Sequence, residues 1–292
     1  MSLLPMSVVV DRHSYVLPRS GGPDVEIFAI GDIHGRTDLL AALLEEAARE
    51  PRRAPRRVIV FLGDLIDRGP DSLGAIDLAI GGGARIGADE TIALMGNHET
   101  MMRLAVDPAT ARGDAIDALG TWAMNGGDRF VAEFVDLDAA PTDAAALLSA
   151  IRASLPPRVA QWLEDLRPYW RSREILFVHA GVNPRVDLEA FLATPWNTPL
   201  RRVDEDRHWA WVRWPFLDHA PGPEGWSGLF VVHGHTPNDA RPHASHADQI
   251  KKFRLNLDAG SGLTGVAEMA IIRDDRAEVV TARGPTNRTL GL

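Results

Sequence analysis

The 292-residue sequence contains no cysteine. This excludes disulfides, zinc sites built on thiolates, and a cysteine nucleophile for phosphoester cleavage. A chain without cysteine is compatible with a reducing compartment, and we expect a cytoplasmic protein. The sequence also has no apolar run approaching the roughly 18 residues that span a bilayer, and no basic segment precedes its first apolar residues. Neither a membrane span nor a signal peptide is therefore expected.

Positive charge is scarce relative to negative charge. Lys and Arg number 31 against 40 Asp and Glu, which gives a formal net charge of −9. A protein that bound a nucleic-acid duplex or an acidic membrane face by neutralising phosphates would carry the opposite balance. We expect neither partner, whereas a small anionic substrate is compatible with this charge.

The overall composition is that of a globular protein. Hydrophobic residues make up 45% of the chain and charged residues 24%, and the length is sufficient for a sizeable core. Residues 1–24 are interpreted as an N-terminal extension that ends in the turn-rich run Ser20-Gly21-Gly22-Pro23. No internal repeat or long linker follows, so residues 25–292 are expected to form a single domain.

The first half of the sequence alternates short apolar runs with helical patterns. These patterns predict strands at 25–30, 58–62 and 91–95, and helices at 37–50 and 71–80. We expect the second helix to stop at its glycine run, 81–83. The β-α-β-α-β order predicts a sheet that begins with parallel strands.

The rest of the sequence divides into a helical part and a strand-rich part. Residues 100–172 are rich in alanine, and we expect a mainly helical insertion there without strands. Further strands are predicted at 174–179, 229–233, 254–257, 267–272 and 277–281. The last three are short and close together, which favours antiparallel pairs in this half.

Five short motifs end or follow predicted strands, and each places Asp, Asn or His beside glycine. They are Gly31-Asp32-Ile33-His34-Gly35, Gly63-Asp64-Leu65-Ile66-Asp67-Arg68-Gly69, Gly96-Asn97-His98-Glu99, His179-Ala180-Gly181 and Gly234-His235-Thr236-Pro237. In α/β proteins, ligands bind at the carboxyl ends of the parallel strands. One such motif alone is more often a turn or a helix N-cap, but five in order at five strand ends indicate one shared site. Oxygen and imidazole ligands without thiolate favour Mn, Fe or Zn.

The motifs resemble those of the calcineurin-like metallophosphoesterases, specifically the phosphoprotein-phosphatase (PPP-type) serine/threonine phosphatases in their bacterial and phage form. The resemblance covers roughly residues 25–273 and is most specific in Gly-Asp-Ile-His-Gly, Gly-Asp-Leu-Ile-Asp-Arg-Gly and Gly-Asn-His-Glu. It implies a four-layer α/β/β/α sandwich with mixed sheets, and a metal-dependent phosphoesterase.

The resemblance also implies two divalent metal ions, Mn first, with Fe or Zn as alternatives. The first metal would be bound by Asp32, His34 and Asp64. The second would be bound by Asp64, Asn97, His179 and His235, so that Asp64 bridges the pair. Pro237 stands where many other metallophosphoesterases have a further His, as in the PPP-type branch, which would leave one metal with fewer protein ligands.

This constellation matches the chemistry of phosphomonoester hydrolysis. Two divalent cations lower the pKa of a shared water, which makes hydroxide available near neutral pH, and they hold the phosphoryl oxygens for in-line attack. A serine alkoxide is a poor leaving group, so the reaction needs a proton donor. His98 is the candidate general acid, and Asp67, by resemblance, would hold its imidazole. The guanidinium of Arg68 is suited to form two parallel hydrogen bonds with the phosphate oxygens that the metals do not bind.

A second phosphate-binding arginine is expected between the last two histidine motifs. The stretch Trp211-Val212-Arg213-Trp214-Pro215-Phe216 resembles the one that supplies it, and we assign the role to Arg213; the alternative is an arginine that only stacks on the adjacent Trp side chains. The side chains expected to contact the substrate phosphate are Arg68, Arg213, Asn97 and His98.

Three other features have both a structural and a functional interpretation. Residues 121–127 resemble a stretch near the substrate mouth of bacterial members, although Asn125-Gly126-Gly127 could simply end a helix. Asp258-Ala259-Gly260-Ser261-Gly262 resembles the closing motif of the family, and we expect a turn rather than a ligand. His233 is expected to end a strand.

The leading hypothesis is a serine/threonine protein phosphatase, with a phosphorylated protein or a small phosphoester as substrate. The complete Asp67-Arg68-Gly69 and Gly96-Asn97-His98-Glu99 favour this branch. The alternative within the same fold is a symmetrical dinucleoside tetraphosphatase, for which tryptophans at 209–226 could stack adenine. A catalytically inactive binding module is a further alternative, but such a protein would have lost a metal ligand or the general acid, and this sequence keeps both. A phosphodiesterase or nuclease is disfavoured by the negative net charge of the chain. The oligomeric state does not follow from the sequence.

Overall fold

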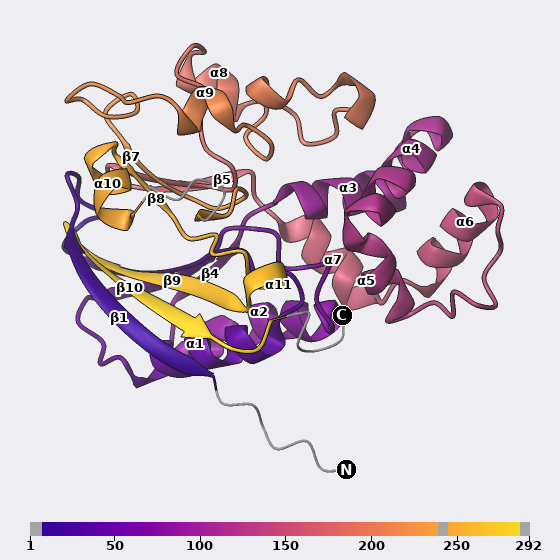
Figure 1. The fold of residues 1–292 in the computed structure, drawn as a ribbon, viewed down its shortest axis with the longest axis horizontal. Coiled ribbons are helices and arrows are strands. Elements are labelled where there is room, and N and C mark those ends of the chain that lie inside the picture. Colours follow the sequence, from indigo (N-terminus) through magenta and orange to yellow (C-terminus); the bar gives the residue numbers. More distant parts are fainter. Residues whose placement is uncertain (1–7, 239–244, 287–292) are drawn as a thin grey trace.

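Two β-sheets stacked face to face form the centre of the structure, a computed structural model that describes residues 8–238 and 245–286. Helices cover the two outer faces: α1 (Thr37–Arg49) and α2 (Ser72–Ile86) lie outside one sheet, and α8 (Leu188–Leu192) and α9 (Trp214–Leu217) lie beyond the other (Figure 1). This is the four-layer arrangement with mixed sheets that the sequence predicts.

The larger sheet has six strands in the order β1-β10-β9-β2-β3-β4. Their bounds are Val9–Val16 (β1), Val25–Ile30 (β2), Arg56–Phe61 (β3), Glu90–Ala93 (β4), Val266–Arg273 (β9) and Arg276–Arg283 (β10). Strands β2, β3 and β4 are parallel, as the β-α-β-α-β order predicts. Strands β9, β10 and β1 continue the sheet in antiparallel fashion from β2.

Strand β1 lies within the segment that the sequence suggested was an N-terminal extension. Val9–Val16 pairs with β10 along its whole length, so this part of residues 1–24 belongs to the sheet. Arg12 also anchors it to α1, with Nη2 2.7 Å from Glu46 and Nη1 2.6 Å from Glu50. The strand is at the sheet edge and half exposed, so it lacks the apolar run by which buried strands are detected.

The smaller sheet has four strands in the order β5-β6-β7-β8. Their bounds are Tyr169–Ser172 (β5), Ile175–Val178 (β6), Phe230–His233 (β7) and Arg254–Asn256 (β8). The expectation that 100–172 contains no strand is wrong, because β5 forms an antiparallel hairpin with β6. Antiparallel pairing was correctly expected for β9 and β10, but β8 pairs in parallel with β7.

Most of the remaining helices come between β4 and β5 in the sequence. In space they form a lobe at one end of the sheets (Figure 1). They are α3 (Asn97–Val106), α4 (Arg112–Trp122), a π-helical turn (Ala123–Gly127), α5 (Asp128–Ala132), α6 (Ala144–Ser154) and α7 (Pro157–Asp165). Two short helices, α10 (His246–Lys251) and α11 (Ser261–Thr264), flank β8. Among the helices of the described segments, none has the length and apolar character needed to cross a membrane.

Helix α2 does not stop at the glycine run 81–83, contrary to expectation. It continues to Ile86 and ends at Gly87, whose φ of 66° is left-handed. A side chain at Gly83 would overlap Thr91 Oγ1, and one at Gly82 would come within 3.1 Å of Phe61. The small residues therefore allow the helix to pack closely against β3 and β4, and this packing offsets the low helix propensity of glycine.

The two faces of each central strand belong to different parts of the core. On β2, Ile27 and Ala29 pack between the sheets with Phe177 and Val232, whereas Phe28 and Ile30 pack against the helices outside the larger sheet. All six residues of β2 are buried. The central strands are thus fixed on both sides, and their carboxyl ends form a rigid platform.

Candidate metal centre and active site

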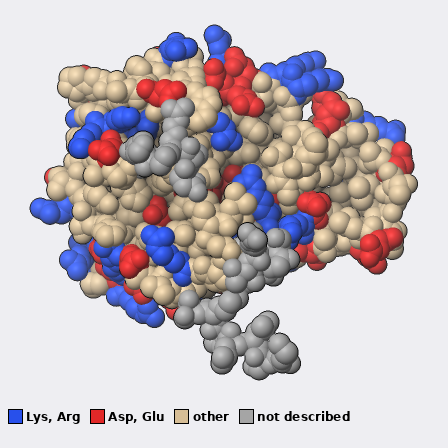
Figure 2. All heavy atoms as spheres, in the orientation of Figure 1, with Lys and Arg blue, Asp and Glu red and all other residues tan. Residues whose placement is uncertain are grey.

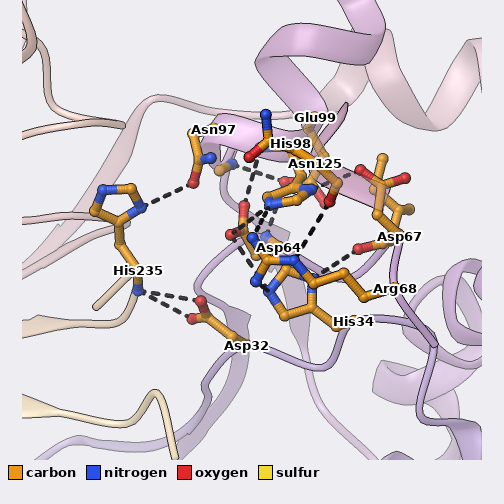
Figure 3. A network of polar contacts seen from close by, with 12 residues as sticks. Asp32, His34, Asp64, Asp67, Arg68, Asn97, His98, Glu99, Asn125 and His235 are labelled. Carbon is orange, nitrogen blue, oxygen red and sulfur yellow. Dashed lines mark hydrogen bonds and ion pairs between the residues drawn. The ribbon is translucent and has the colours of Figure 1, made fainter. Parts of the chain in front are cut away.

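The five sequence motifs meet at the carboxyl ends of strands from both sheets. Asp32 follows β2 and Asp64 follows β3, while Asn97 begins α3, which is separated from β4 by the residues 94–96. His179 follows β6 and His235 follows β7, on the smaller sheet. All five side chains are buried. Because they follow strands of both sheets, the site is built from the two sheets together. Figure 3 labels four of the five residues, namely Asp32, Asp64, Asn97 and His235.

Asp64 occupies the centre of this group. Its Oδ1 lies 3.3 Å from His179 Nε2, and its Oδ2 lies 3.7 Å from His34 Nε2. Two sets of candidate ligand atoms, each within 4.8 Å of one another, share this residue: His34, Asp64 and His98 in one, and Asp64, His179 and His235 in the other. One carboxylate therefore faces both sets.

The imidazoles are oriented by backbone carbonyls behind them. His34 Nδ1 lies 2.9 Å from the carbonyl of Ile66, and His179 Nδ1 lies 2.9 Å from that of Leu62. With Nδ1–H donating, Nε2 of each neutral ring presents a lone pair to the site. His235 is reversed: its Nε2 lies 3.2 Å from the Trp211 carbonyl, so its Nδ1 faces inward.

These inward-facing atoms are arranged to hold a cation. Asn97 Oδ1 lies 2.8 Å from His235 Nδ1 and 3.1 Å from His179 Nε2, which is itself close to Asp64. Lone pairs that converge at such distances repel one another unless a proton or a cation lies between them. Imidazole, carboxylate and amide oxygen are the ligand types of Mn, Fe and Zn, so the donor set fits a divalent metal.

Asp32 contacts the backbone of the motif that contains His235. Its carboxylate accepts a hydrogen bond from the backbone N–H of His235, at 3.1 Å from Oδ2, and it is absent from both clusters of candidate ligand atoms among the described residues. Burial raises the pKa of Asp32 well above its usual value, and the negative charges of Asp258 and Asp64 raise it further. A nearby cation would relieve this repulsion.

The charge state of the central carboxylate differs from that of Asp32. Burial alone would raise the pKa of Asp64, but the neighbouring His179 and His98 hold it well below its usual value. Burial and the Arg68 guanidinium lower the pKa of His34 well below its usual value, which keeps that imidazole neutral. His179 differs from His34: burial would lower its pKa, but the Asp64 carboxylate raises it above its usual value, so a metal bound there would have to displace a proton from this imidazole.

His98 is held by a chain of buried polar contacts. Its Nδ1 lies 2.6 Å from Asp67 Oδ2, and Trp122 Nε1 donates to both oxygens of Asp67, at 2.8 and 3.0 Å. All three side chains are fully buried. Burial, with the Arg68 charge, lowers the pKa of His98 to about 4, although Asp64 opposes the shift. Sequence reasoning placed Trp122 near the substrate mouth but missed this contact, for which no local pattern gives a signal.

Arg68 lies between the two histidines of the first cluster. Its Nη1 is 2.9 Å from His34 Nε2, and its Nη2 is 2.8 Å from His98 Nε2 (Figure 3). The backbone of the π-helical turn supports it, since Arg68 N–H donates to the Gly126 carbonyl at 3.2 Å and Nε contacts the Asn125 carbonyl at 3.4 Å. Residues 121–127 therefore border the site and are more than a helix end.

Arg213 immediately precedes α9, one of the helices beyond the smaller sheet. Its Nη1 donates to Thr236 Oγ1 at 3.1 Å, in the motif that contains His235. Its positive charge also contributes, after burial, to lowering the pKa of His235 well below its usual value. Burial lowers the pKa of His98, and the positive charges of both Arg68 and Arg213 add to this shift, so both guanidinium groups lie near the histidine cluster.

Glu99 organises the backbone beneath Asp64, a role that sequence reasoning did not assign. Its Oε2 accepts from the N–H groups of Asp64 and Gly96, at 2.8 and 2.9 Å, and its Oε1 accepts from Leu65 N–H at 2.9 Å. Its position three residues after Gly96 at the start of α3 is the usual place for a capping carboxylate, and this was the available signal. A side chain at Gly96 would overlap Asp64 Oδ1, so the close approach requires glycine.

Backbone strain is concentrated in the same region. Among the described residues, nine that are not glycine have positive φ, and five of these are His34, Asp64, Asp67, Arg68 and His235. Each such conformation costs about 1–3 kcal/mol and persists only where surrounding contacts impose it. The fold therefore contains locally unfavourable backbone conformations that orient these side chains toward the site.

His233 ends a strand and Asp258 lies in a turn, as the sequence predicts. His233 ends β7, and its Nδ1 lies 3.1 Å from the Gly234 carbonyl, outside both clusters of candidate ligand atoms. Asp258 forms a turn in which its Oδ1 accepts from Gly260 N–H at 2.8 Å. Asp258 belongs to neither cluster of candidate ligand atoms, but its negative charge adds to the effect of burial in raising the pKa of Asp32.

Comparisons with known proteins agree with this geometry. The family model described as calcineurin-like phosphoesterase matches residues 25–287. The chain is 39% identical over 104 residues to "Serine/threonine-protein phosphatase 1" of Salmonella typhimurium, covering 36% of this chain and 40% of that protein. It is 30% identical over 164 residues to "Bis(5'-nucleosyl)-tetraphosphatase, symmetrical" of Klebsiella pneumoniae, covering 56% of this chain and 45% of that protein.

These matches span less than half the length of either curated relative. Among solved structures, that of a cold-active protein tyrosine phosphatase is similar to this one with a TM-score of 0.55. The similarity covers 88% of this chain and 77% of that chain, at 17% sequence identity. At this identity the structural similarity supports the fold alone.

Proposed function

Since this chain belongs to the calcineurin-like phosphoesterase family, we propose that it is a binuclear metal-dependent phosphomonoester hydrolase, most specifically a serine/threonine protein phosphatase. The family recognised in the sequence motifs is thereby confirmed, and with it the class of metal-dependent phosphoesterase. The observation that carries the proposal is the placement of Asp64, whose two carboxylate oxygens face two different groups of histidines.

Two divalent metal ions, Mn first and Fe or Zn as alternatives, would be held by the residues around Asp64. We assign Asp32, His34 and Asp64 to one ion, and Asp64, Asn97, His179 and His235 to the other. When bound, such a pair supplies an activated water and offsets the charge of the phosphoryl group. The carbonyls of Ile66, Leu62 and Trp211 serve to orient the three imidazoles toward the ions.

His98 would act as the general acid. Since its Nδ1 is engaged by Asp67, its Nε2 is the atom that would give a proton to the leaving oxygen. This Nε2 faces Arg68 and the Asp64 carboxylate, 3.9 Å from Oδ2, and so points toward the reacting group. Asp67 would stabilise the positive charge of protonated His98, and Trp122 would hold Asp67 in place.

Arg68 and Arg213 would bind the phosphate oxygens, together with Asn97 and His98. Two guanidinium groups suffice for one terminal phosphoryl group. The face shown in Figure 2 has acidic and basic side chains interspersed, without a broad basic field that a long polyanion would need. This supports a phosphomonoester over a nucleic-acid substrate.

A symmetrical dinucleoside tetraphosphatase is the second candidate, because a relative of that name matches 56% of this chain. Trp211 is the tryptophan to test for base stacking: it is only partly buried, and its ring lies edge-on to His235 at 6.5 Å. Trp209 is buried, and its Nε1 donates to the Thr194 carbonyl, so it belongs to the core.

The two candidates are separated by comparing kcat/KM, with Mn²⁺, for a phosphoseryl or phosphothreonyl peptide and for diadenosine tetraphosphate. We expect the peptide to be the better substrate, and chelation of the metal to abolish turnover of both. A dinucleotide preference of about tenfold or more, equivalent to about 1.4 kcal/mol, that disappears in Trp211→Ala would establish the second candidate instead.

A further inference from the structure

Asp67, the residue that engages His98, has a strained backbone. Its φ is 73°, and that of the next residue, Arg68, is 64°. Such left-handed conformations persist in residues other than glycine only where surrounding contacts impose them. The hydrogen bonds from Trp122 hold the Asp67 carboxylate, and the backbone requires a contact of its own.

That contact is the side chain of Ser72, five residues later in the chain. Asp67 N–H donates to Ser72 Oγ at 3.0 Å, and both residues are fully buried. Ser72 is the first residue of α2, so this hydrogen bond ties the strained turn to the start of a 15-residue helix. Gly69, within the turn, packs so closely on the His34 carbonyl that a side chain there would overlap it. The turn is thus fixed both at its Asp67 N–H and at Gly69.

Glu133 holds the same end of α2 from the helical lobe. It follows α5 directly, and its two carboxylate oxygens accept from Ser72 N–H at 2.6 Å and from Leu73 N–H at 2.7 Å. Burial raises the pKa of Glu133, and the N–H groups of Leu73 and Ser72 oppose that shift, as does a hydrogen bond from the Ser72 hydroxyl. A carboxylate at this end of a helix is also favoured by the helix dipole.

These contacts form one chain of hydrogen bonds from the lobe to the proposed acid. The Ser72 hydroxyl donates to Glu133, and its oxygen accepts from Asp67 N–H, so one side chain serves as both donor and acceptor. The Asp67 carboxylate in turn lies 2.6 Å from His98 Nδ1. A displacement of Ser72 would therefore be transmitted to the imidazole through Asp67.

We propose that Ser72 and Glu133 are positioning residues for the general acid: Glu133 fixes Ser72, and Ser72 holds the Asp67 backbone in the conformation that presents its carboxylate to His98. The inference rests on the proposed function, in which His98 protonates the leaving oxygen. It gives a role in catalysis to the contact between Glu133 and α2, both of which lie outside the five sequence motifs.

Ser72→Ala removes the acceptor of Asp67 N–H and leaves every proposed metal ligand and phosphate-binding side chain in place. We expect kcat for an alkyl phosphate to fall by about tenfold and kcat for p-nitrophenyl phosphate by less than about threefold, because nitrophenolate leaves with little protonation. The metal content should match that of the wild type. Glu133→Gln is a second variant at a half-buried position. It should also affect the alkyl ester more than the nitrophenyl ester, but with a smaller loss, since one acceptor oxygen remains.

Asp71→Ala is the matched control at the same end of α2. The Asp71 side chain accepts from Gly74 N–H at 2.8 Å and so caps the helix through a different backbone group. Its loss should lower the melting temperature, while kcat for both esters changes by less than about twofold. If Asp71→Ala instead reproduced the ester dependence of Ser72→Ala, any loosening of the helix would have this effect, and the specific role of Ser72 would be overturned.

A background without the acid gives a stricter test. In His98→Asn, the additional substitution Ser72→Ala should change kcat for the alkyl ester by less than about twofold, because the imidazole that Ser72 positions is absent. A further tenfold loss in that background would show that Ser72 acts through Arg68 or through the fold as a whole. Equal losses for the two esters in the single variant Ser72→Ala would lead to the same conclusion.

Hydrogen exchange judges the positioning independently of turnover. Mass spectrometry of the metal-loaded protein should show faster exchange of the backbone amides in peptides covering residues 64–70 for Ser72→Ala and Glu133→Gln than for the wild type. Asp71→Ala should match the wild type. Unchanged exchange in both positioning variants would reject the proposal, whatever the enzyme hydrolyses. If exchange changes as expected but His98→Asn shows no dependence on the leaving group, it is the proposed acid role that fails, and Ser72 remains a support of the turn.

Discussion

His98 and Asp67 form a buried pair in which Nδ1 of the imidazole lies 2.6 Å from Oδ2 of the carboxylate. Neither side chain is accessible to solvent. Burial raises the pKa of Asp67 well above its usual value, although the hydrogen bond from Trp122 opposes the shift. The same burial lowers the pKa of His98 to about 4. Both shifts oppose separated charges on this buried pair.

The first prediction concerns this pair. His98→Asn should leave the metal content nearly intact and lower kcat by about 10²–10⁴, the usual contribution of a general acid. The loss should be smaller for p-nitrophenyl phosphate, because nitrophenolate leaves with little protonation. Kinetics with an alkyl and a nitrophenyl ester, with metal analysis of each preparation, test this. Equal losses for the two esters would reject the acid role, and loss of metal would make His98 a ligand.

The second prediction concerns the Trp122 indole. Trp122→Phe removes the N–H that donates to Asp67, and kcat should fall by roughly tenfold or more, since a hydrogen bond to a charged group contributes about 1.5–3 kcal/mol. As for His98→Asn, the defect should be larger for alkyl than for nitrophenyl esters. Trp162→Phe is the matched control, because Trp162 is also buried and its Nε1 has no hydrogen-bond partner among the residues that the structure describes. A defect of the same size with both leaving groups would indicate a packing role only.

The third prediction concerns Asp64. Because its two oxygens face different histidine groups, Asp64→Asn should lower metal occupancy at both positions and abolish turnover. Elemental analysis of metal-replete protein should give about two ions per chain for the wild type and less than one for the variant. The control is Asp77→Asn, an exposed aspartate paired with Arg158. At most one ion in active wild-type protein would contradict the binuclear proposal.

The fourth prediction concerns His246 and the dependence of stability on pH. Burial alone would lower the pKa of His246, but its hydrogen bond to Glu268, 3.0 Å from Nε2, raises it above the usual value. Tyr15 packs edge-on against the ring, and Thr281 donates to the other oxygen of Glu268. A folded-state pKa above the unfolded value means that the folded protein binds the proton more tightly.

Protonated His246 should therefore stabilise the fold fully below its unfolded pKa, about 6.5, and this stabilisation should vanish as pH rises through the raised folded pKa. We expect His246→Gln to reduce the free energy of unfolding more at pH 5.5 than at pH 8.5, as measured by denaturant titration of metal-free protein. Glu268→Gln should remove most of this difference. A cost of His246→Gln that does not change with pH would show that packing, not charge, is responsible.

Much of the candidate site could be predicted because it follows local pattern. A buried β-branched run followed by glycine and a polar residue marks the carboxyl end of a central strand, and β2 and β3 begin and end within two residues of expectation. The motifs after these strands converge in the structure because parallel neighbours end at one edge. Asp32 and Asp64 could therefore be placed together from the sequence.

The rest depends on contacts between distant segments. Strand β1 is defined by its partner β10 at the other end of the chain, and its own residues do not distinguish it from a loop. The glycines of α2 break helices in isolation but are required where a helix lies close to a sheet. Glu99 and Trp122 act through partners 35 and 55 residues away, which no periodicity or local motif encodes.

The hydrogen bond from His235 to Asp32 joins residues 203 positions apart and crosses from one sheet to the other. Neither sheet alone contains all the groups of the proposed site, so this site is incomplete until the two sheets have docked. Contacts of such sequence separation form slowly, because a long loop must close before they are made. During refolding, recovered helix and strand signals should precede recovered activity. We therefore expect partly folded chains, in which the two sheets have not yet docked, to have no activity toward phosphoesters.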